Sequence, residues 1–304
     1  PGTTTEPIDR CRDITNSSDG GYVAVCRNTF VKISNSGVIE WQKTYWEDSV
    51  LFSINLTSDG GYISAGYINL GDRDVRIIKL DANGDKVWEN YYGGSGNEVC
   101  YPRIVELSNG DYVFTAWSTS YGAGGYDFWV VRIDKNGNMV WDKTFGGTGM
   151  DFPEAMIRTS DNYLIITGFT TSYGSGGEDV WVLKLDTNGN LIWSKTFGGE
   201  GNERAHWPGG LKEIPGEGYI IVGETNSYGE GDKDYYLLKI DPDGNLIWQK
   251  TYGGSFRDIA RSVDLTPDGG LIVSGMTRSF GAGGSDVWIL KLDENGDCLG
   301  SGCP

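Results

Sequence analysis

Six positions along this chain of 304 residues combine chemically varied side chains, and one of them is the only histidine. Five of the positions follow a recurring acidic residue by three places, and Phe52 is assigned to the equivalent position in the second repeat. Imidazole, guanidinium, carboxylate and phenol groups at one level would suit a pocket for a polar ligand. The alternative is a narrow channel that these side chains fill with mutual salt bridges. The residues are Arg12, Phe52, Tyr101, Glu154, His206 and Arg261, with Trp207 beside the histidine.

Catalysis would require a nucleophile, or an acid and a base at a defined separation. Glu154 with His206 or Tyr101 is a combination that a glycosidase or lyase could use, but sequence alone gives no distances. We therefore assign no catalytic residue. One histidine and five scattered cysteines cannot build a zinc or haem site, so neither cofactor is expected.

The recurring acidic residue opens the first predicted strand of every repeat. If the first strands line one axis, six carboxylates form a ring that could hold Ca²⁺, which prefers several oxygen ligands. The alternative is structural: each carboxylate accepts hydrogen bonds from the backbone of its own glycine-rich turn. Regular repetition favours the structural role. The residues are Asp9, Asp48 or its neighbour, Glu98, Asp151, Glu203 and Asp258.

These positions belong to an internal repeat of about 52 residues. The string SYGAGGYDFWVVRIDKNGNMVWDKTFGG at 120–147 returns at 172–199 and 227–254, and in part at 279–297. Such periods filled with short strands indicate propeller blades. We predict one all-β domain over 1–304, a six-bladed β-propeller of four-stranded antiparallel blades. The units are roughly 9–45, 48–94, 98–147, 151–199, 203–254 and 258–304.

Within each unit, DGG and DxNG strings predict tight hairpin turns. The third and fourth strands read as nearly continuous apolar runs, which predicts burial on both faces. The fifth unit carries an insertion, HWPGGLKEIPGEG, at its first turn. The sixth unit lacks a fourth strand, because CLGSGCP stands where LIWQKTYGG would follow. Residues 1–8 could complete that blade, or a partner chain could do so by strand addition.

The cysteines suggest an oxidising compartment. Cys11 and Cys26 flank the turn NSSDGG and should face each other across a hairpin, as a disulfide or as two buried thiols. Cys298 and Cys303 could close a small terminal loop, which leaves Cys100 odd and buried.

The strings DGGY, TxSxGxGGxDxW, KLDxNG and WxKTxGG resemble the repeats of secreted and cell-surface β-propeller proteins of bacteria and archaea. The match covers nearly the whole chain and weakens in the first unit and the last seven residues. The resemblance implies an extracellular or cell-surface propeller and no specific activity. Asn16 and Asn55 stand in glycosylation sequons, which fits export.

The amino-acid composition excludes some classes of binding partner. The net charge of −17 argues against nucleic acid and anionic membranes, and no apolar run is long enough to insert into a bilayer. We predict an exported, non-enzymatic binding or surface-structural module whose partner is a glycan or another surface protein. The alternatives are a carbohydrate-active enzyme at the channel mouth and a polymer subunit joined by strand exchange. Aromatic residues in the SYGxGG loops could stack on sugars or on a neighbouring subunit, or cover the next blade: Tyr121, Tyr173, Tyr228 and Phe280.

Overall fold

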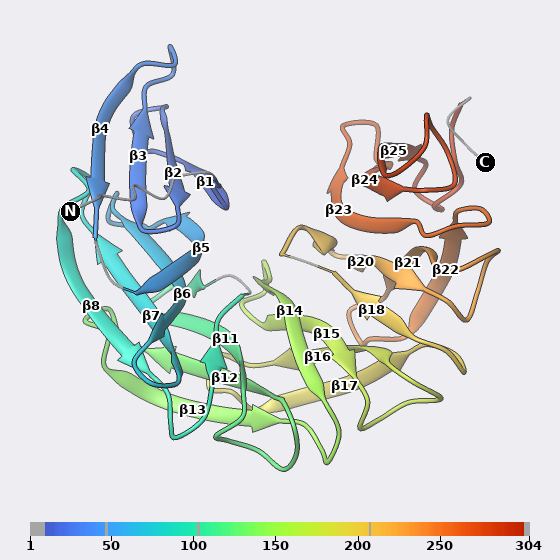
Figure 1. The fold of residues 1–304 in the computed structure, drawn as a ribbon, viewed down its shortest axis with the longest axis horizontal. Coiled ribbons are helices and arrows are strands. Elements are labelled where there is room, and N and C mark those ends of the chain that lie inside the picture. Colours follow the sequence, from blue (N-terminus) through green and yellow to red (C-terminus); the bar gives the residue numbers. More distant parts are fainter. Residues whose placement is uncertain (1–9, 46–47, 102–103, 207, 301–304) are drawn as a thin grey trace, which may run out of the picture. The chain divides into compact units, whose positions relative to one another are not determined.

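The computed structural model describes residues 10–45, 48–101, 104–206 and 208–300, and they form an all-β protein of six antiparallel sheets. The chain divides into two compact units, which we describe separately. Unit 1 comprises residues 1–122 and 128–144, and unit 2 comprises residues 123–127 and 145–304. Each unit contains three sheets that follow one another in chain order (Figure 1). The single-domain assignment stays a prediction.

Unit 1 contains two four-stranded meanders and a third sheet whose first strand is split in two. The first sheet contains β1 (Asp13–Asn16), β2 (Tyr22–Cys26), β3 (Thr29–Ile33) and β4 (Ile39–Thr44). The second contains β5 (Ser49–Leu56), β6 (Tyr62–Asn69), β7 (Arg73–Leu80) and β8 (Lys86–Tyr92). The third contains β9 (Glu98–Val99), β10 (Val105–Glu106), β11 (Tyr112–Ser118), β12 (Asp127–Ile133) and β13 (Met139–Phe145).

Unit 2 repeats the pattern with two departures from it. Its first sheet contains β14 (Asp151–Arg158), β15 (Leu164–Thr170), β16 (Asp179–Leu185) and β17 (Leu191–Phe197). Its second contains β18 (Glu203–Ala205), the 3₁₀ turn η1 (Pro208–Gly210), β19 (Leu211–Ile214), β20 (Gly218–Thr225), β21 (Asp234–Ile240) and β22 (Leu246–Tyr252). Its third contains only β23 (Ile259–Leu265), β24 (Leu271–Thr277) and β25 (Asp286–Leu292) among the described residues.

The two departures correct one prediction and confirm another. The extra residues of the fifth repeat do not enlarge the first turn. They form η1 and β19 instead, so they divide the first strand into β18 and β19, both of which pair with β20. The sixth repeat lacks a fourth strand within the described residues, as predicted, and β25 is therefore an edge strand except for an isolated bridge between Leu292 and Cys298.

Apolar residues between neighbouring sheets make the core of each unit. In unit 2, Ile221 and Leu238 of the second sheet pack toward the first, while Val222 and Leu237 pack toward the third. A sheet with neighbours on both sides has two buried faces, so every residue of β20 and β21 is buried. The prediction for the third strands is confirmed for β21, but the third strand β25 of the last sheet exposes Val287 and Ile289. It was wrong for the fourth strands, which lie at sheet edges with Ile192 and Ile247 exposed.

The recurring tryptophan and the NG turn are explained by contacts between neighbouring sheets. The indole Nε1 of Trp193 on β17 donates to the Pro242 carbonyl in the next turn, at 3.1 Å. The same ring lies against Gly244, whose φ of +79° and missing side chain permit both the turn and the contact. Trp41, Trp88 and Trp248 lie in the same way against Gly84, Gly137 and Gly296.

The disulfide between Cys11 and Cys26 is present, and Cys100 is buried, as predicted. Burial raises the pKa of the Cys100 thiol, which keeps it protonated and inert. Cys303 lies outside the described residues, so its bond with Cys298 stays a prediction. No helix among the described residues is long and apolar enough to cross a membrane.

Candidate functional site

The first strands of neighbouring sheets lie next to each other within each unit. In unit 1, the Ile54 amide on β5 donates to the Asp13 carboxylate on β1 at 2.9 Å. In unit 2, Lys212 on β19 forms an ion pair with Asp264 on β23, 3.1 Å apart. Side chains that leave these strands on the same side are therefore brought together within a unit.

The predicted ligand-contacting residues are displayed by a repeated irregularity. β5, β14 and β23 each contain a bulge, and the residue that the ladder skips is Phe52, Glu154 or Arg261. A bulge re-aims a side chain and leaves its residue out of the strand pairing. The bulge therefore allows the side chain at this position to vary between repeats. The sequence spacing predicted the variable position, but it did not predict the bulge.

In unit 1 three of the predicted residues form one stack. The Phe52 ring lies 4.6 Å from the Tyr101 ring, centroid to centroid, and the Arg12 guanidinium carbon lies 4.7 Å from the Phe52 centroid. A guanidinium over an aromatic face is a cation–π contact. The structure therefore brings Arg12, Phe52 and Tyr101 together as predicted.

In unit 2 the histidine belongs to a charged cluster around a buried carboxylate. Glu224 on β20 is almost fully buried, with His206 Nε2 at 3.4 Å, Arg257 Nη2 at 3.3 Å and the Lys233 ammonium in direct contact. The separation from His206 is that of an ion pair rather than a well-aligned hydrogen bond. Burial alone would raise the pKa of Glu224, but contacts with His206 and Lys233 hold it well below its usual range. Glu224 is therefore a permanent counter-ion and not a general acid.

A second ion pair lies beside this cluster. The Arg204 guanidinium makes a two-point contact with the Glu178 carboxylate, and its carbon lies 4.5 Å from the Phe169 centroid. The hydrogen bond to Glu178 raises the pKa of Arg204, and the carboxylates of Glu224 and Glu154 add to the effect. Glu154 thus belongs to the same electrostatic neighbourhood as Glu224.

Sequence reasoning missed the residues that surround His206: Glu178, Arg204, Glu224, Lys233 and Arg257. One signal was available, because Glu224 stands where other repeats carry an aromatic residue: Tyr67, Trp117 and Phe169. The predicted neighbour Trp207 lies outside the described residues.

The recurring carboxylates have structural partners. Asp258 is fully buried and accepts hydrogen bonds from the Gly254 amide at 3.0 Å, the Ser279 hydroxyl at 2.6 Å and the Thr277 hydroxyl. Glu98, Asp151 and Glu203 accept the equivalent bonds. Donors occupy these oxygens, so the carboxylates do not fit a Ca²⁺ site, and no group of three or more potential ligands is arranged for a metal within the described residues.

The pattern is interrupted at the start of the chain. Asp48 is exposed, and its neighbour Ser49 occupies the buried position, where its hydroxyl donates to the Asn28 side chain at 2.9 Å. Asp9 lies outside the described residues. Of the two sequons, Asn16 is exposed at the end of β1, whereas the Asn55 amide donates to the Ile104 carbonyl at 2.8 Å. Only Asn16 presents a solvent-exposed side chain for modification.

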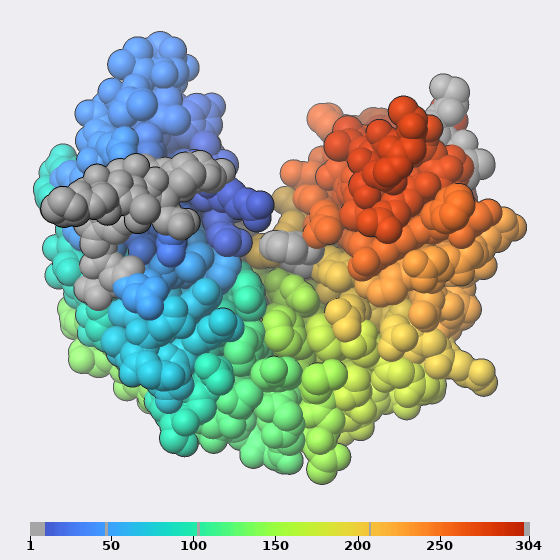
Figure 2. All heavy atoms as spheres, in the orientation of Figure 1, coloured from blue at the N-terminus to red at the C-terminus, as the bar shows by residue number. Residues whose placement is uncertain are grey.

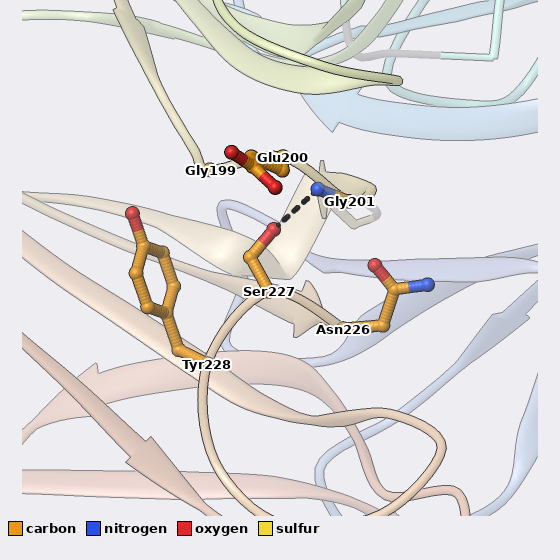
Figure 3. Close-up of a pocket in the computed structure, with 6 residues that line it drawn as sticks. All are labelled: Gly199, Glu200, Gly201, Asn226, Ser227 and Tyr228. Carbon is orange, nitrogen blue, oxygen red and sulfur yellow. Dashed lines mark hydrogen bonds between the residues drawn. The ribbon is translucent and has the colours of Figure 1, made fainter.

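Two of the SYGxGG and GG loops of unit 2 outline a pocket. It has a volume of about 630 Å³ and is lined by Gly199, Glu200, Gly201, Asn226, Ser227 and Tyr228 (Figure 3). The Gly201 amide donates to the Ser227 hydroxyl at 2.8 Å, and this bond joins the two loops. A phenol ring, an exposed carboxylate and an amide around one hollow supply the groups that bind sugars.

The loop aromatics are held in place by the preceding repeat. The hydroxyl groups of Tyr121, Tyr173 and Tyr228 donate to the first glycine carbonyl of each preceding GG pair at 2.8–2.9 Å. Each ring also contacts an aromatic residue on the third strand of its own repeat. They still offer surface, because Tyr173 is 47% exposed and Phe280 is 37% exposed.

Stacked antiparallel four-stranded sheets of this kind define an all-β, propeller-like protein. The chain is similar to the periplasmic gluconolactonase of Pseudomonas aeruginosa, with 15% identity, a TM-score of 0.61, and coverage of 95% of this chain and 83% of that one. It is also similar to the virginiamycin B lyase of Staphylococcus aureus, with 14% identity, a TM-score of 0.56, and coverage of 97% and 85%. The Pan2 WD40 domain of Neurospora crassa matches with 14% identity, a TM-score of 0.55, and coverage of 86% and 71%.

At such identities the likeness concerns the fold alone. No family model and no curated protein matches the sequence.

Proposed function

We propose that the chain is an exported, non-enzymatic β-propeller of six blades that binds a glycan. The observation that carries the proposal is the pocket beside Tyr228, which combines a phenol ring with the polar side chains of Glu200 and Asn226. Export is supported by the disulfide and by the resemblance to secreted repeats. Residues 1–8, which lie outside the described residues, would complete the sixth blade and close the ring.

Binding is favoured over catalysis by the state of the charged groups. Glu224 stays ionised because of its cationic neighbours, and it faces the only histidine of the chain. Glu224 is therefore not available as the acid of the acid and base pair that glycoside hydrolysis needs. A carbohydrate-active enzyme at the channel mouth is the alternative from a different class.

The test uses variants that other repeats already contain. Glu200→Ser copies Ser95 and Ser255, and Asn226→Thr copies Thr119 and Thr171, so the double variant should fold normally. We expect a screen of the wild-type protein on immobilised glycans to find a ligand. The double variant should bind it at least about fivefold more weakly, because it loses two polar contacts worth about 1 kcal/mol together or more. The matched control is Glu217→Ser, which removes an exposed carboxylate on another turn, where it pairs with the buried Lys239.

A second candidate function, assembly into a polymer, is supported by the last sheet. Within the described residues β25 has no fourth strand beside it, and its Val287 and Ile289 are 80% and 55% exposed. The equivalent residues of β21, Tyr235 and Leu237, are buried against the next sheet. Figure 2 shows this last sheet in orange and red. An open edge beside an apolar face is a site for strand addition from another copy.

A further inference from the structure

Three cations gather where the second and third sheets of unit 2 meet. Lys233 and Arg257 form a backbone bridge, and the Arg278 amide donates to the Arg257 carbonyl at 3.0 Å. The three side chains therefore leave adjacent backbone segments. The Arg278 side chain is exposed, and those of Arg257 and Lys233 are partly exposed.

The repeat shows that this concentration is local. The position of Arg257 holds Asn97, Met150 and Asn202 in other repeats, and the position of Arg278 holds Thr119, Thr171 and Asn226. The chain as a whole has a net charge of −17, so two cationic residues at these two positions of one junction are a local departure from its acidic composition. The fold does not require them there, because the other junctions form without them.

The negative charge beside these cations does not balance them. Glu224 is the buried counter-ion of both Lys233 and Arg257, while Asp258 is occupied by the hydrogen bonds of its own turn. Asp232 and Glu230 lie on the exposed loop before Lys233. The Arg257 Nε atom is shielded from solvent and makes no hydrogen bond within the described residues. The Arg278 Nε atom donates to the Ser285 hydroxyl at 3.1 Å, so the terminal nitrogens of Arg278 are the donors that remain for a ligand beside Arg257.

An aromatic side chain accompanies the cations. Phe256 is 62% exposed and stands where other repeats carry a glycine: Gly96, Gly149 and Gly201. Its amide donates to the Ser279 hydroxyl at 3.0 Å, which is the bond that the glycine makes elsewhere. The loop is thus unchanged, and the phenyl ring is an addition. Ser255, Phe256, Arg278 and Phe280 occupy the positions that line the pocket of the preceding repeat.

We propose that this junction binds the carboxylate of an acidic sugar, such as a uronic acid residue, with Arg257 and Arg278 on the carboxylate and Phe256 against the sugar ring. Guanidinium groups recognise carboxylates by paired hydrogen bonds, and an exposed ring supplies the apolar surface that a pyranose face covers. This inference rests on the proposed glycan-binding function and specifies its ligand class. The pocket beside Tyr228 would take a neighbouring sugar.

The test compares an oligogalacturonate with a neutral cello-oligosaccharide of the same length by isothermal titration calorimetry. The variants are Arg257→Asn with Arg278→Thr, and separately Phe256→Gly, all residues that other repeats carry. We expect the wild-type protein to bind the oligogalacturonate more tightly, and added salt to weaken that binding. The arginine double variant should lose about tenfold or more in affinity for it, with neutral binding unchanged. Phe256→Gly should weaken the binding of both sugars.

Several results would overturn the inference. Neutral binding with no preference for the carboxylate would leave the proposed function standing and reject the acidic ligand. Equal binding of oligogalacturonate by the wild type and the arginine variant would do the same. Dextran sulfate bound as tightly as the oligogalacturonate, with equal loss in the variant, would indicate a general polyanion site. Binding of no sugar at all would reject both proposals. Unchanged circular dichroism and melting temperature establish that each variant is folded.

Discussion

At the scale of single residues, the first glycine of each GG pair is explained by two carboxylates. A Cβ atom at Gly253 would lie 1.7 Å from Asp234 Oδ1 and 2.9 Å from Asp258 Oδ2, so only glycine fits there. Gly198 lies in the same way between Asp179 and Glu203. Asp258 is saturated by hydrogen bonds, whereas Asp234 Oδ1 is buried without a partner. The two acids of the Gly253 pair therefore differ in how well their oxygens are hydrogen-bonded.

We predict that Asp234→Asn stabilises the protein above neutral pH. Burial raises the pKa of Asp234 to about 6, and the charges of Asp258 and Glu230 contribute. An acid with a raised pKa in the folded state favours folding while protonated, and that contribution is lost as the pH rises from about 4 to about 6. The asparagine amide is neutral at any pH, so it removes the repulsion from Asp258. We expect the substitution to raise the free energy of unfolding, measured by urea titration, by about 1 kcal/mol at pH 7.5 and by less at pH 4.5. An equal shift at both values would contradict this assignment.

At the scale of elements, the order of the strands and the positions of the turns could be predicted from the sequence. The residues that each side chain contacts could not. Tight DGG and DxNG turns and apolar runs suffice to predict β22 at Leu246–Tyr252, because hairpin geometry and side-chain period are local properties. The burial of the fourth strands was mispredicted, since exposure depends on which strand lies at a sheet edge. The counter-ions of Glu224 come from three different segments, and no local pattern brings them together.

The disulfide between Cys11 and Cys26 stabilises the first sheet. Cys11 lies ahead of β1, and Cys26 ends β2, so the disulfide closes a hairpin over a sequence separation of 15. A loop of this size corresponds to about 3 kcal/mol of stabilisation. We expect dithiothreitol to lower the free energy of unfolding of the wild-type protein by about that amount, measured by guanidinium titration. Cys11→Ser should already show the loss and respond no further, and a response of equal size in that variant would assign the effect to another bond.

At the scale of the whole molecule, the last sheet is the incomplete part of the repeat. Every earlier third strand is paired on both sides, whereas β25, among the residues that the structure describes, is paired with β24 and otherwise makes only the bridge between Leu292 and Cys298. Ile272, Val287 and Ile289 expose on this sheet the face that Ile220, Tyr235 and Leu237 bury on the sheet before it. Burial of exposed aliphatic side chains contributes roughly 1.5–3 kcal/mol each. A folded chain should therefore cover this face with its own terminus or with another copy.

The two ways of covering β25 predict different behaviour in solution. If residues 1–8 complete the sixth blade, the full chain is a monomer in sedimentation velocity, and deletion of these residues causes association that rises with concentration. Val287→Lys with Ile289→Lys should suppress that association, because charges on an edge strand oppose pairing between sheets. If copies exchange strands instead, the full chain associates already, and the lysine substitutions alone dissociate it. Monomeric behaviour of both the full and the shortened chain, with equal melting temperatures, would exclude both and leave β25 without a strand partner.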